Sequence, residues 1–202
     1  SFFRTSISRP LSRAKTSWNG ALCTTRFASC SNTVDETGGD DASAVRCFGR
    51  TDQGFRPFIW REGTMTELPL PPEATSGFAS DINRRGDVIG GFWVGDELGG
   101  ALVWSNGERA LLPGLPGLVP FVRGINDRGD IVGSVGDGTG FEVPVLWRNR
   151  VPINLNELIP ADDPLKSCSR LDVADAINNS GMIAVFGVDV CVTPSPLSTY
   201  RL

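Results

Sequence analysis

One short motif occurs three times in this chain: Ile-Asn, two variable residues, a glycine, one further residue and then Ile or Val. The copies begin at Ile82, Ile125 and Ile177, so they are separated by 43 and 52 residues. The first interval fits a structural repeat of about 40–45 residues, and the second indicates about nine inserted residues. We place this insertion within residues 160–166. A repeated module is therefore the first constraint on the fold.

The tryptophans follow the same period. Trp18, Trp60, Trp104 and Trp147 are spaced by 42, 44 and 43 residues, and Tyr200 follows 53 residues later in the position of the next tryptophan. The last three tryptophans each end a short apolar strand and precede a turn. We interpret these three as packing residues between modules rather than as sugar-stacking platforms, because apolar neighbours precede each of them.

Each Ile-Asn motif has the composition of a hairpin. In Asn126-Asp-Arg-Gly129 the asparagine suits the first position of a type I turn, and the glycine suits a left-handed fourth position, which gives a bulged hairpin. Asn83–Gly86 and Asn178–Gly181 fit in the same way. The flanking residues are β-formers. The motif therefore predicts that the first two strands of each module form a hairpin.

Four short antiparallel strands per module predict an all-β fold, in which each module is a blade of a β-propeller. Solenoid repeats are generally shorter. Whole blades are expected at 25–70, 71–113 and 114–156, with three strands of a last blade in 157–202. Residues 1–24 form a basic N-terminal segment with a partial first blade, and 25–202 the remaining blades of one domain. We expect five blades closed by N- and C-terminal strands, the alternative being an open segment that pairs with another chain.

These residues resemble a bacterial extracellular repeat family named for its His-Ala-Phe tripeptide (HAF repeat). The resemblance covers residues 55–187 and rests on the Trp-turn-Leu pattern at 57–68 and 101–112 and on the motif at 82–91 and 125–133. The chain departs from the family by having no histidine, and Pro or Ala stands in the alanine position. The resemblance implies a secreted, propeller-like scaffold and transfers no catalytic residue.

Composition removes several kinds of chemistry. The chain has no histidine, so His-based acid–base catalysis and His metal sites are excluded. No apolar run approaches the ~18 residues of a membrane helix, which predicts no transmembrane segment. The first 34 residues carry five basic side chains and no acidic one, whereas the net charge is −4, so the remainder is strongly acidic. Nucleic acid is therefore not an expected partner.

The basic N-terminal arm has two interpretations. Its Arg- and Ser-rich composition is typical of an organellar transit peptide, but we treat it as part of the working protein. As such it could dock on an acidic protein or on an anionic lipid surface. The alternative is a solvated basic edge with no partner.

Five cysteines without a C-x-x-C pair indicate disulfides and an extracellular or periplasmic location. Cys168 and Cys191 flank the last hairpin. They face each other if its loop has two residues, and miss by one position with a bulged type I turn unless a second bulge restores the register. Cys30 and Cys47 are predicted as a second pair, which leaves Cys23 as the odd thiol.

Acidic residues recur in the loop between the second and third strand of each module. The residues are Asp52, Asp96, Asp137 and Asp189. Equivalent loops of a propeller project from one face, so the carboxylates could form a ring that binds sugar hydroxyls or calcium, the only cofactor considered. The alternative is that they are ordinary turn residues. Trp93 is a further candidate for ligand contact, because Phe92 and Trp93 alternate and one must face outward.

Catalysis finds little support. A glycosidase needs two carboxylates flanking a sugar, whereas Asp96 and Glu97, like Asp40 and Asp41, are adjacent in sequence. The segment 35–41 lacks the spacing of a calcium loop. We therefore expect no catalytic residue and no metal site. The predicted function is a non-enzymatic, exported binding or assembly module, either lectin-like or a structural subunit that binds a glycan or a protein. The alternative is a small glycosidase-like, carbohydrate-active enzyme.

Overall fold

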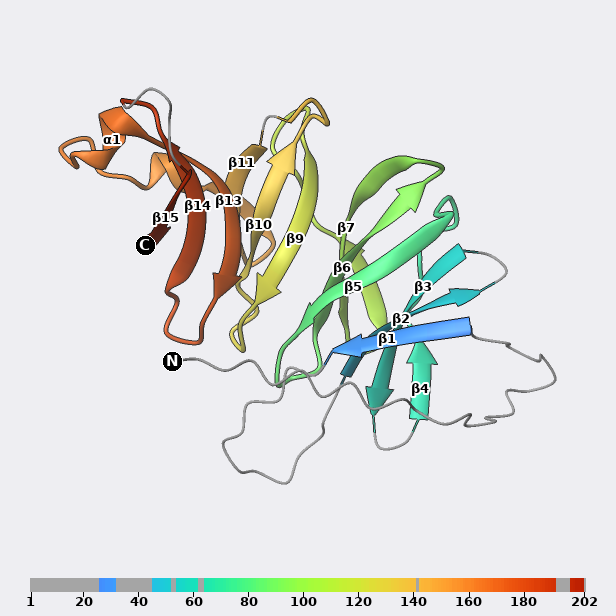
Figure 1. Cartoon of the computed structure of the whole chain (residues 1–202). Helices are drawn as coiled ribbons and strands as arrows, with labels where there is room; N and C mark the ends of the chain where they lie inside the picture. The colour runs from blue at the N-terminus through green and yellow to red at the C-terminus, as the bar shows by residue number, and fades with distance from the viewer. Residues whose placement is uncertain are drawn as a thin grey trace.

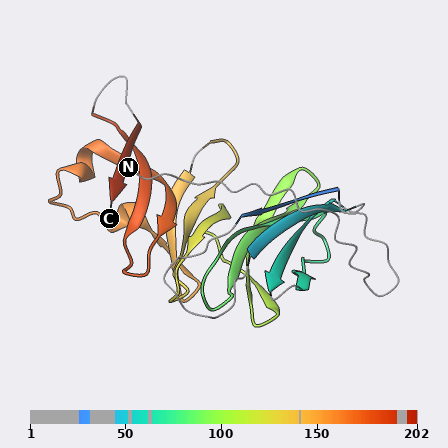
Figure 2. The ribbon, with the colours of Figure 1, turned by 60° about the horizontal axis from the view of Figure 1, so that its bottom comes forward.

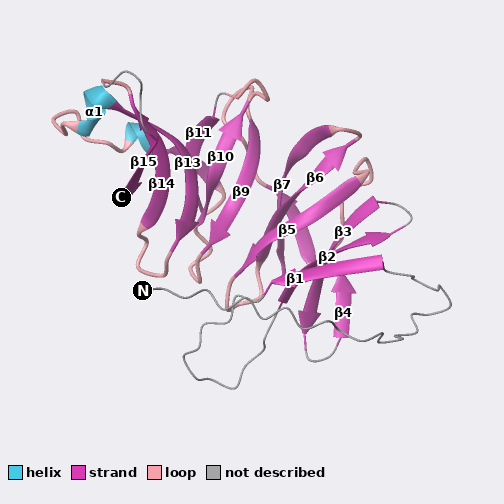
Figure 3. Cartoon of the chain, viewed as in Figure 1, coloured by secondary structure: helices cyan, strands magenta, loops and turns pink. Residues whose placement is uncertain are grey.

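The computed structural model describes residues 26–31, 45–51, 54–61, 64–140, 142–191 and 197–201. These residues form four antiparallel sheets, in each of which hydrogen-bonded neighbours are consecutive in sequence. The all-β prediction is therefore confirmed. The only helices in the described part are the 3-10 turn η1 (Leu155–Glu157) and the short helix α1 (Leu165–Cys168). In the chain, both fall between the last strand of the third sheet and the first strand of the fourth, and α1 overlaps the predicted insertion at 160–166. Figure 3 draws them in cyan.

The strand boundaries coincide with the predicted modules. Sheet 1 contains β1 (Arg26–Ser31), β2 (Val45–Thr51), β3 (Gly54–Arg61) and β4 (Thr64–Glu67). Sheet 2 contains β5 (Ser76–Ile82), β6 (Val88–Val94), β7 (Glu97–Ser105) and β8 (Glu108–Leu111). Sheet 3 contains β9 (Val119–Ile125), β10 (Ile131–Gly136), β11 (Glu142–Arg148) and β12 (Val151–Asn154). Sheet 4 contains β13 (Ser169–Ile177), β14 (Ile183–Asp189) and β15 (Leu197–Arg201).

The four sheets follow one another side by side in chain order, with sheets 1 and 4 at opposite ends of the row (Figures 1 and 2). None of the four sheets closes on itself. One apolar cluster fills each boundary between successive sheets. Because strand side chains alternate, Val88 packs toward sheet 1 and its neighbour Ile89 toward sheet 3, while Val132 of sheet 3 packs toward sheet 4. Sheets 2 and 3 thus each contribute their two faces to two different boundaries.

The Ile-Asn motifs form the predicted hairpins. In each of them the glycine N–H donates to the carbonyl of the motif asparagine at 3.0 Å, as in Gly129 to Asn126. The three motif glycines, Gly86, Gly129 and Gly181, have φ angles of +81°, +86° and +89°, a left-handed conformation that side chains rarely adopt. The bulged type I turn is therefore confirmed at all three positions.

The motif asparagine also binds within and beyond its own turn. The Asn126 side-chain oxygen accepts from the backbone N–H groups of Arg128 (3.0 Å) and Asp130 (2.9 Å). Its amide nitrogen donates to the Asp130 carboxylate (3.1 Å) and to the carbonyl of Asn178 in the next sheet (3.3 Å). Asn83 makes the equivalent bonds in sheet 2 and donates to the carbonyl of Asn126. We call this chain of bonds the asparagine ladder.

The carboxylates of the ladder are held ionised by their partners. Burial alone would raise the pKa of Asp130, but hydrogen bonds from Asn126, Arg148 and Arg128 outweigh it, so the pKa lies below its ordinary value. The pKa of Asp87 is lowered in the same way, by Ser105, Asn83 and Arg85 against the effect of burial. The hairpin ends of the sheets therefore carry fixed negative charges matched by arginines.

The tryptophans behave as predicted from their period. Trp104 and Trp147 are 2% and 0% exposed, and Trp60 is partly buried. The indole N–H of Trp104 donates to the carbonyl of Pro69, and that of Trp147 to the carbonyl of Pro113, at 2.8 and 2.7 Å. Both acceptors lie in the link that joins the preceding sheet to the sheet of the tryptophan. The indoles therefore tie successive sheets together.

The predicted disulfide between Cys168 and Cys191 is present, with the two Cα atoms 4.9 Å apart. The strand register differs from the prediction, because β13 has two irregularities, so the pairing shifts twice along the hairpin. Neither cysteine lies in a paired strand: Cys168 ends α1, and its carbonyl accepts from Val190 rather than from Cys191. The bond therefore clamps the chain just beyond the strand ends. Cys30 and Cys47 are register partners on β1 and β2, and Cys23 lies outside the described residues.

Candidate functional site

A cavity of about 690 Å³ lies where sheets 2 and 3 meet. The β6–β7 turn, the start of β9 and the β10–β11 loop form its walls. Four carboxylates line it together with an aromatic ring: Asp96, Glu97, Asp137, Glu142 and Phe121. Two of the predicted loop acids, Asp96 and Asp137, are therefore brought to one cavity by elements that are far apart in sequence. Asp189 does not line it, and Asp52 lies outside the described residues.

Glu142 is the unusual carboxylate of this cavity. Its Oε2 atom is buried and, among the described residues, is the one buried side-chain oxygen or nitrogen without a hydrogen-bond partner. An ionised oxygen in that position has lost water without gaining a donor, which is unfavourable in the free protein. Glu142 also lines the cavity, so a ligand bound there lies beside this carboxyl group.

Asp137 has a structural role as well as its place in the cavity wall. Its carboxylate accepts from the backbone N–H (2.9 Å) and the hydroxyl (2.6 Å) of Thr139. These hydrogen bonds lower the pKa of Asp137, so it stays ionised and is a poor proton donor. Asp189 likewise accepts from the backbone N–H of Cys191 at 2.9 Å. The turn interpretation therefore holds for both residues, and for Asp137 it does not exclude ligand contact.

An aromatic row leads away from the cavity. The ring centroid of Phe121 lies 5.6 Å from that of Phe78, and Phe78 lies 4.6 Å from Trp93. All three rings are partly exposed. The guanidinium of Arg123 sits 5.3 Å from the Phe121 ring centroid and also pairs with Asp175 of sheet 4 at 3.5 Å. Trp93, the predicted contact residue, is thus joined through Phe78 to the cavity that holds Asp96 and Asp137.

Two glycines position these aromatic residues. A Cβ on Gly90 would collide with the carbonyl of Phe78, and one on Gly133 with the carbonyl of Phe121. Both glycines end the Gly-x-[Ile/Val]-[Ile/Val]-Gly stretch of the first two motif copies. The first strand of each sheet also changes register beside them, between Ala79 and Asp81 in sheet 2. The motif therefore fixes how closely the aromatic strand approaches its neighbour.

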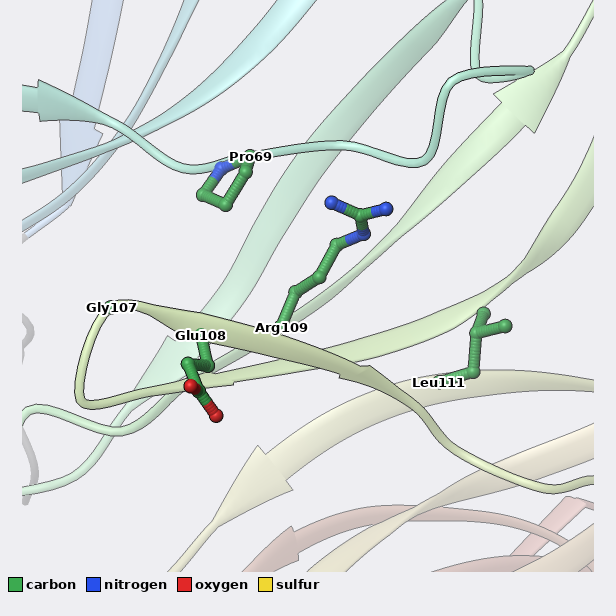
Figure 4. Close-up of a pocket in the computed structure, with 5 residues that line it drawn as sticks. All are labelled: Pro69, Gly107, Glu108, Arg109 and Leu111. Carbon is green, nitrogen blue, oxygen red and sulfur yellow. The ribbon is translucent and has the colours of Figure 1, made fainter.

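A second hollow, of about 550 Å³, lies beside the β7–β8 turn. Figure 4 shows Arg109 reaching toward Pro69, while Glu108 projects on the opposite side of the strand. The Pro69 carbonyl is already bonded to Trp104. Since the polar groups of this hollow do not converge, we take the cavity between sheets 2 and 3 as the candidate site.

The residues that sequence reasoning missed are Glu142, Phe121 and Phe78. Glu142 follows the glycine-rich loop whose aspartate was identified, but one carboxylate at the start of a strand carries no distinguishing pattern. Phe78 and Phe121 occupy equivalent positions, 43 residues apart, on the first strands of sheets 2 and 3. This repeated phenylalanine position was the one sequence feature that pointed to the two rings. Its importance depends on β5 and β9 lying next to each other, which the structure shows.

The described part of the chain contains no group of three or more acidic, Cys or His side chains arranged to hold a metal ion. It also contains no helix that is long and apolar enough to span a membrane. We found no family model, curated protein or solved structure that matches the chain. The function is therefore argued from the cavity alone.

Proposed function

We propose that this chain is a non-enzymatic, exported β-propeller module that binds a carbohydrate in the cavity between sheets 2 and 3. Sugars offer hydroxyl donors and apolar C–H faces. Carboxylates and a partly exposed aromatic ring in one cavity match both kinds of group. The observation that carries the proposal is that Phe121 lines the same cavity as Glu142, whose Oε2 atom is buried without a hydrogen-bond partner.

The fold part of the proposal goes beyond the four open sheets. We infer that they are blades of a five-bladed ring whose remaining blade draws on residues 1–24, with N- and C-terminal strands meeting at the closure. The order of the sheets and the asparagine ladder support this inference. The resemblance to the His-Ala-Phe repeat family and the Cys168–Cys191 disulfide support export to an oxidising compartment.

A small carbohydrate-active enzyme is the second candidate, because the same cavity holds four carboxylates. Such an enzyme needs a proton donor. Asp137 is unsuited to that role because its pKa is lowered. The structure offers no further argument for the third candidate, a structural subunit that binds a protein. Calcium remains part of the proposal in one place only, where Asp96 and Asp137 would act as its ligands.

The test is a glycan array probed with the labelled full chain, followed by calorimetric titration of the glycans that bind. Phe121→Ala and Glu142→Gln should each weaken binding by about tenfold or more, the scale of a lost central contact. Glu108→Gln is the matched control, since it removes an exposed acid outside the cavity. No glycan bound by the wild type, or binding that neither cavity variant alters, would overturn the proposal. Cleavage of the bound glycan, followed by mass spectrometry, would favour the enzyme.

A further inference from the structure

One face of sheet 4 is exposed, although the equivalent face of sheet 3 is buried. By alignment of the motif hairpins, Ala184 and Phe186 occupy the positions of Val132 and Ser134. The latter two are 0% and 2% exposed, and Val132 packs against sheet 4, whereas Phe186 is 45% exposed. Ala184 is exposed as well. In sheets 2 and 3, the face directed toward the following sheet is thus covered by that sheet. In sheet 4, the last sheet described, the equivalent face is exposed.

The exposed residues form one contiguous patch. Phe186 is the register partner of Val173, and Ala184 is that of Ala176, so the four side chains lie on the same side of the β13–β14 pair. We call this patch the terminal face. The asparagine ladder ends beside it: Asn178 is exposed, and no described residue accepts from its amide nitrogen. The terminal face therefore continues the boundaries that already join sheets 2, 3 and 4.

Charge distinguishes the segments that could cover this face. The stretch 155–201, which contains sheet 4 and the link that precedes it, has six acidic and three basic residues, a net charge of −3. Residues 1–25, which lie outside the described part, have four basic residues and no acidic one. A second copy of sheet 4 would bring like charges together, whereas residues 1–25 bring opposite ones.

We propose that residues 1–25 of the same chain dock on the terminal face, and that their basic residues pair with the acidic surroundings of sheet 4. This inference rests on the proposed propeller. The sequence Trp18-Asn19-Gly20 repeats the tryptophan-and-turn pattern of the third and fourth strands, 42 residues before Trp60, so the segment has the side chains for an inter-sheet boundary.

The test is limited trypsin digestion of the full chain, followed by mass spectrometry of cleavage after Arg13 and Lys15. A docked segment should be cut slowly. Phe186→Asp places a charge in the apolar contact and should accelerate both cleavages by about tenfold or more. Cleavage should also accelerate at high salt, which screens the charges. The control is Leu111→Asp, because Leu111 is 59% exposed on sheet 2. It should leave both rates unchanged.

Equal cleavage rates in the wild type and in Phe186→Asp would overturn the inference. So would a wild-type dimer, measured by light scattering, that Phe186→Asp converts to monomer without changing cleavage, because a second copy would then cover the face. Glycan binding is measured on the same variants. It should survive Phe186→Asp, so absence of binding in every protein sinks the carbohydrate proposal and leaves the docking result standing.

Discussion

The side-chain amide of Asn83 donates a hydrogen bond of 3.1 Å to the backbone carbonyl of Asn126, 43 residues later in the chain. Asn126 makes the same bond to Asn178, 52 residues further on. The two intervals are the spacings of the Ile-Asn motif. The repeat in the sequence therefore corresponds to a physical contact. The asparagine of one hairpin caps its own turn and also bonds to the hairpin of the next sheet.

The ladder predicts that Asn126→Ala is much more destabilising than Asn178→Ala. Asn126 is 2% exposed, and its loss leaves the backbone N–H groups of Arg128 and Asp130 without their acceptor. Each buried group left unsatisfied costs about 1–3 kcal/mol, so we expect a loss of about 2–4 kcal/mol in the free energy of unfolding. Asn178 is exposed, and water can replace its bonds. Urea unfolding of both variants measures the difference, and equal losses would contradict it.

Stability should fall on acidification because the ladder carboxylates have lowered pKa values in the folded state. For Asp87 and Asp130 the unfolded chain binds protons first as pH falls. Their contribution is therefore present above the unfolded pKa of about 4 and is lost as pH drops through the folded values, starting near pH 5. Asp130→Asn should flatten the dependence of unfolding free energy on pH in this window. Asp162→Asn, an exposed change, is the control, and an equal flattening there would refute the assignment.

Gly133→Ala should both destabilise the protein and weaken ligand binding. The added Cβ meets the carbonyl of Phe121, so β9 must shift, at a cost of about 1–3 kcal/mol. The shift moves the ring that lines the cavity. Gly107→Ala is the comparison for backbone strain without a clash. Gly107 has φ +82° and open space around it, so the alanine there carries only the backbone cost. Thermal melting and glycan titration should separate the two variants, and unchanged binding in Gly133→Ala would count against Phe121.

Non-reducing peptide mapping should find Cys168 joined to Cys191 and Cys30 joined to Cys47. The first pair is bonded in the structure, and the second pair occupies opposite positions on β1 and β2. Reducing the Cys168–Cys191 bond, which closes a loop of about 24 residues, should cost about 3 kcal/mol in the chain-entropy model. Cys23 should be the residue that an alkylating reagent modifies. Free thiols at Cys168 and Cys191 in protein from its native source would contradict the bond and weaken the case for export.

Local patterns in the sequence sufficed for the elements and their order. Asparagine and glycine at fixed positions specify the bulged turns, since only glycine adopts φ near +85° without strain. Alternating apolar residues specify the strands, and the tryptophan period specifies the length of each module. The Cys168–Cys191 pair was also predictable, although two irregularities in β13 shifted the register in a way that no local signal showed.

The tertiary structure alone decided the site. Asp96 and Asp137 share a cavity because sheets 2 and 3 pack face to face, and Glu142 joins them because its strand starts beneath the same loops. Phe78 and Phe121 meet because a glycine in each neighbouring strand permits close approach. Turns and strands follow from interactions within a few residues of sequence, which the sequence displays. The burial of one carboxylate oxygen and the contact of two rings depend instead on distances between segments about 43 residues apart, which only packing sets.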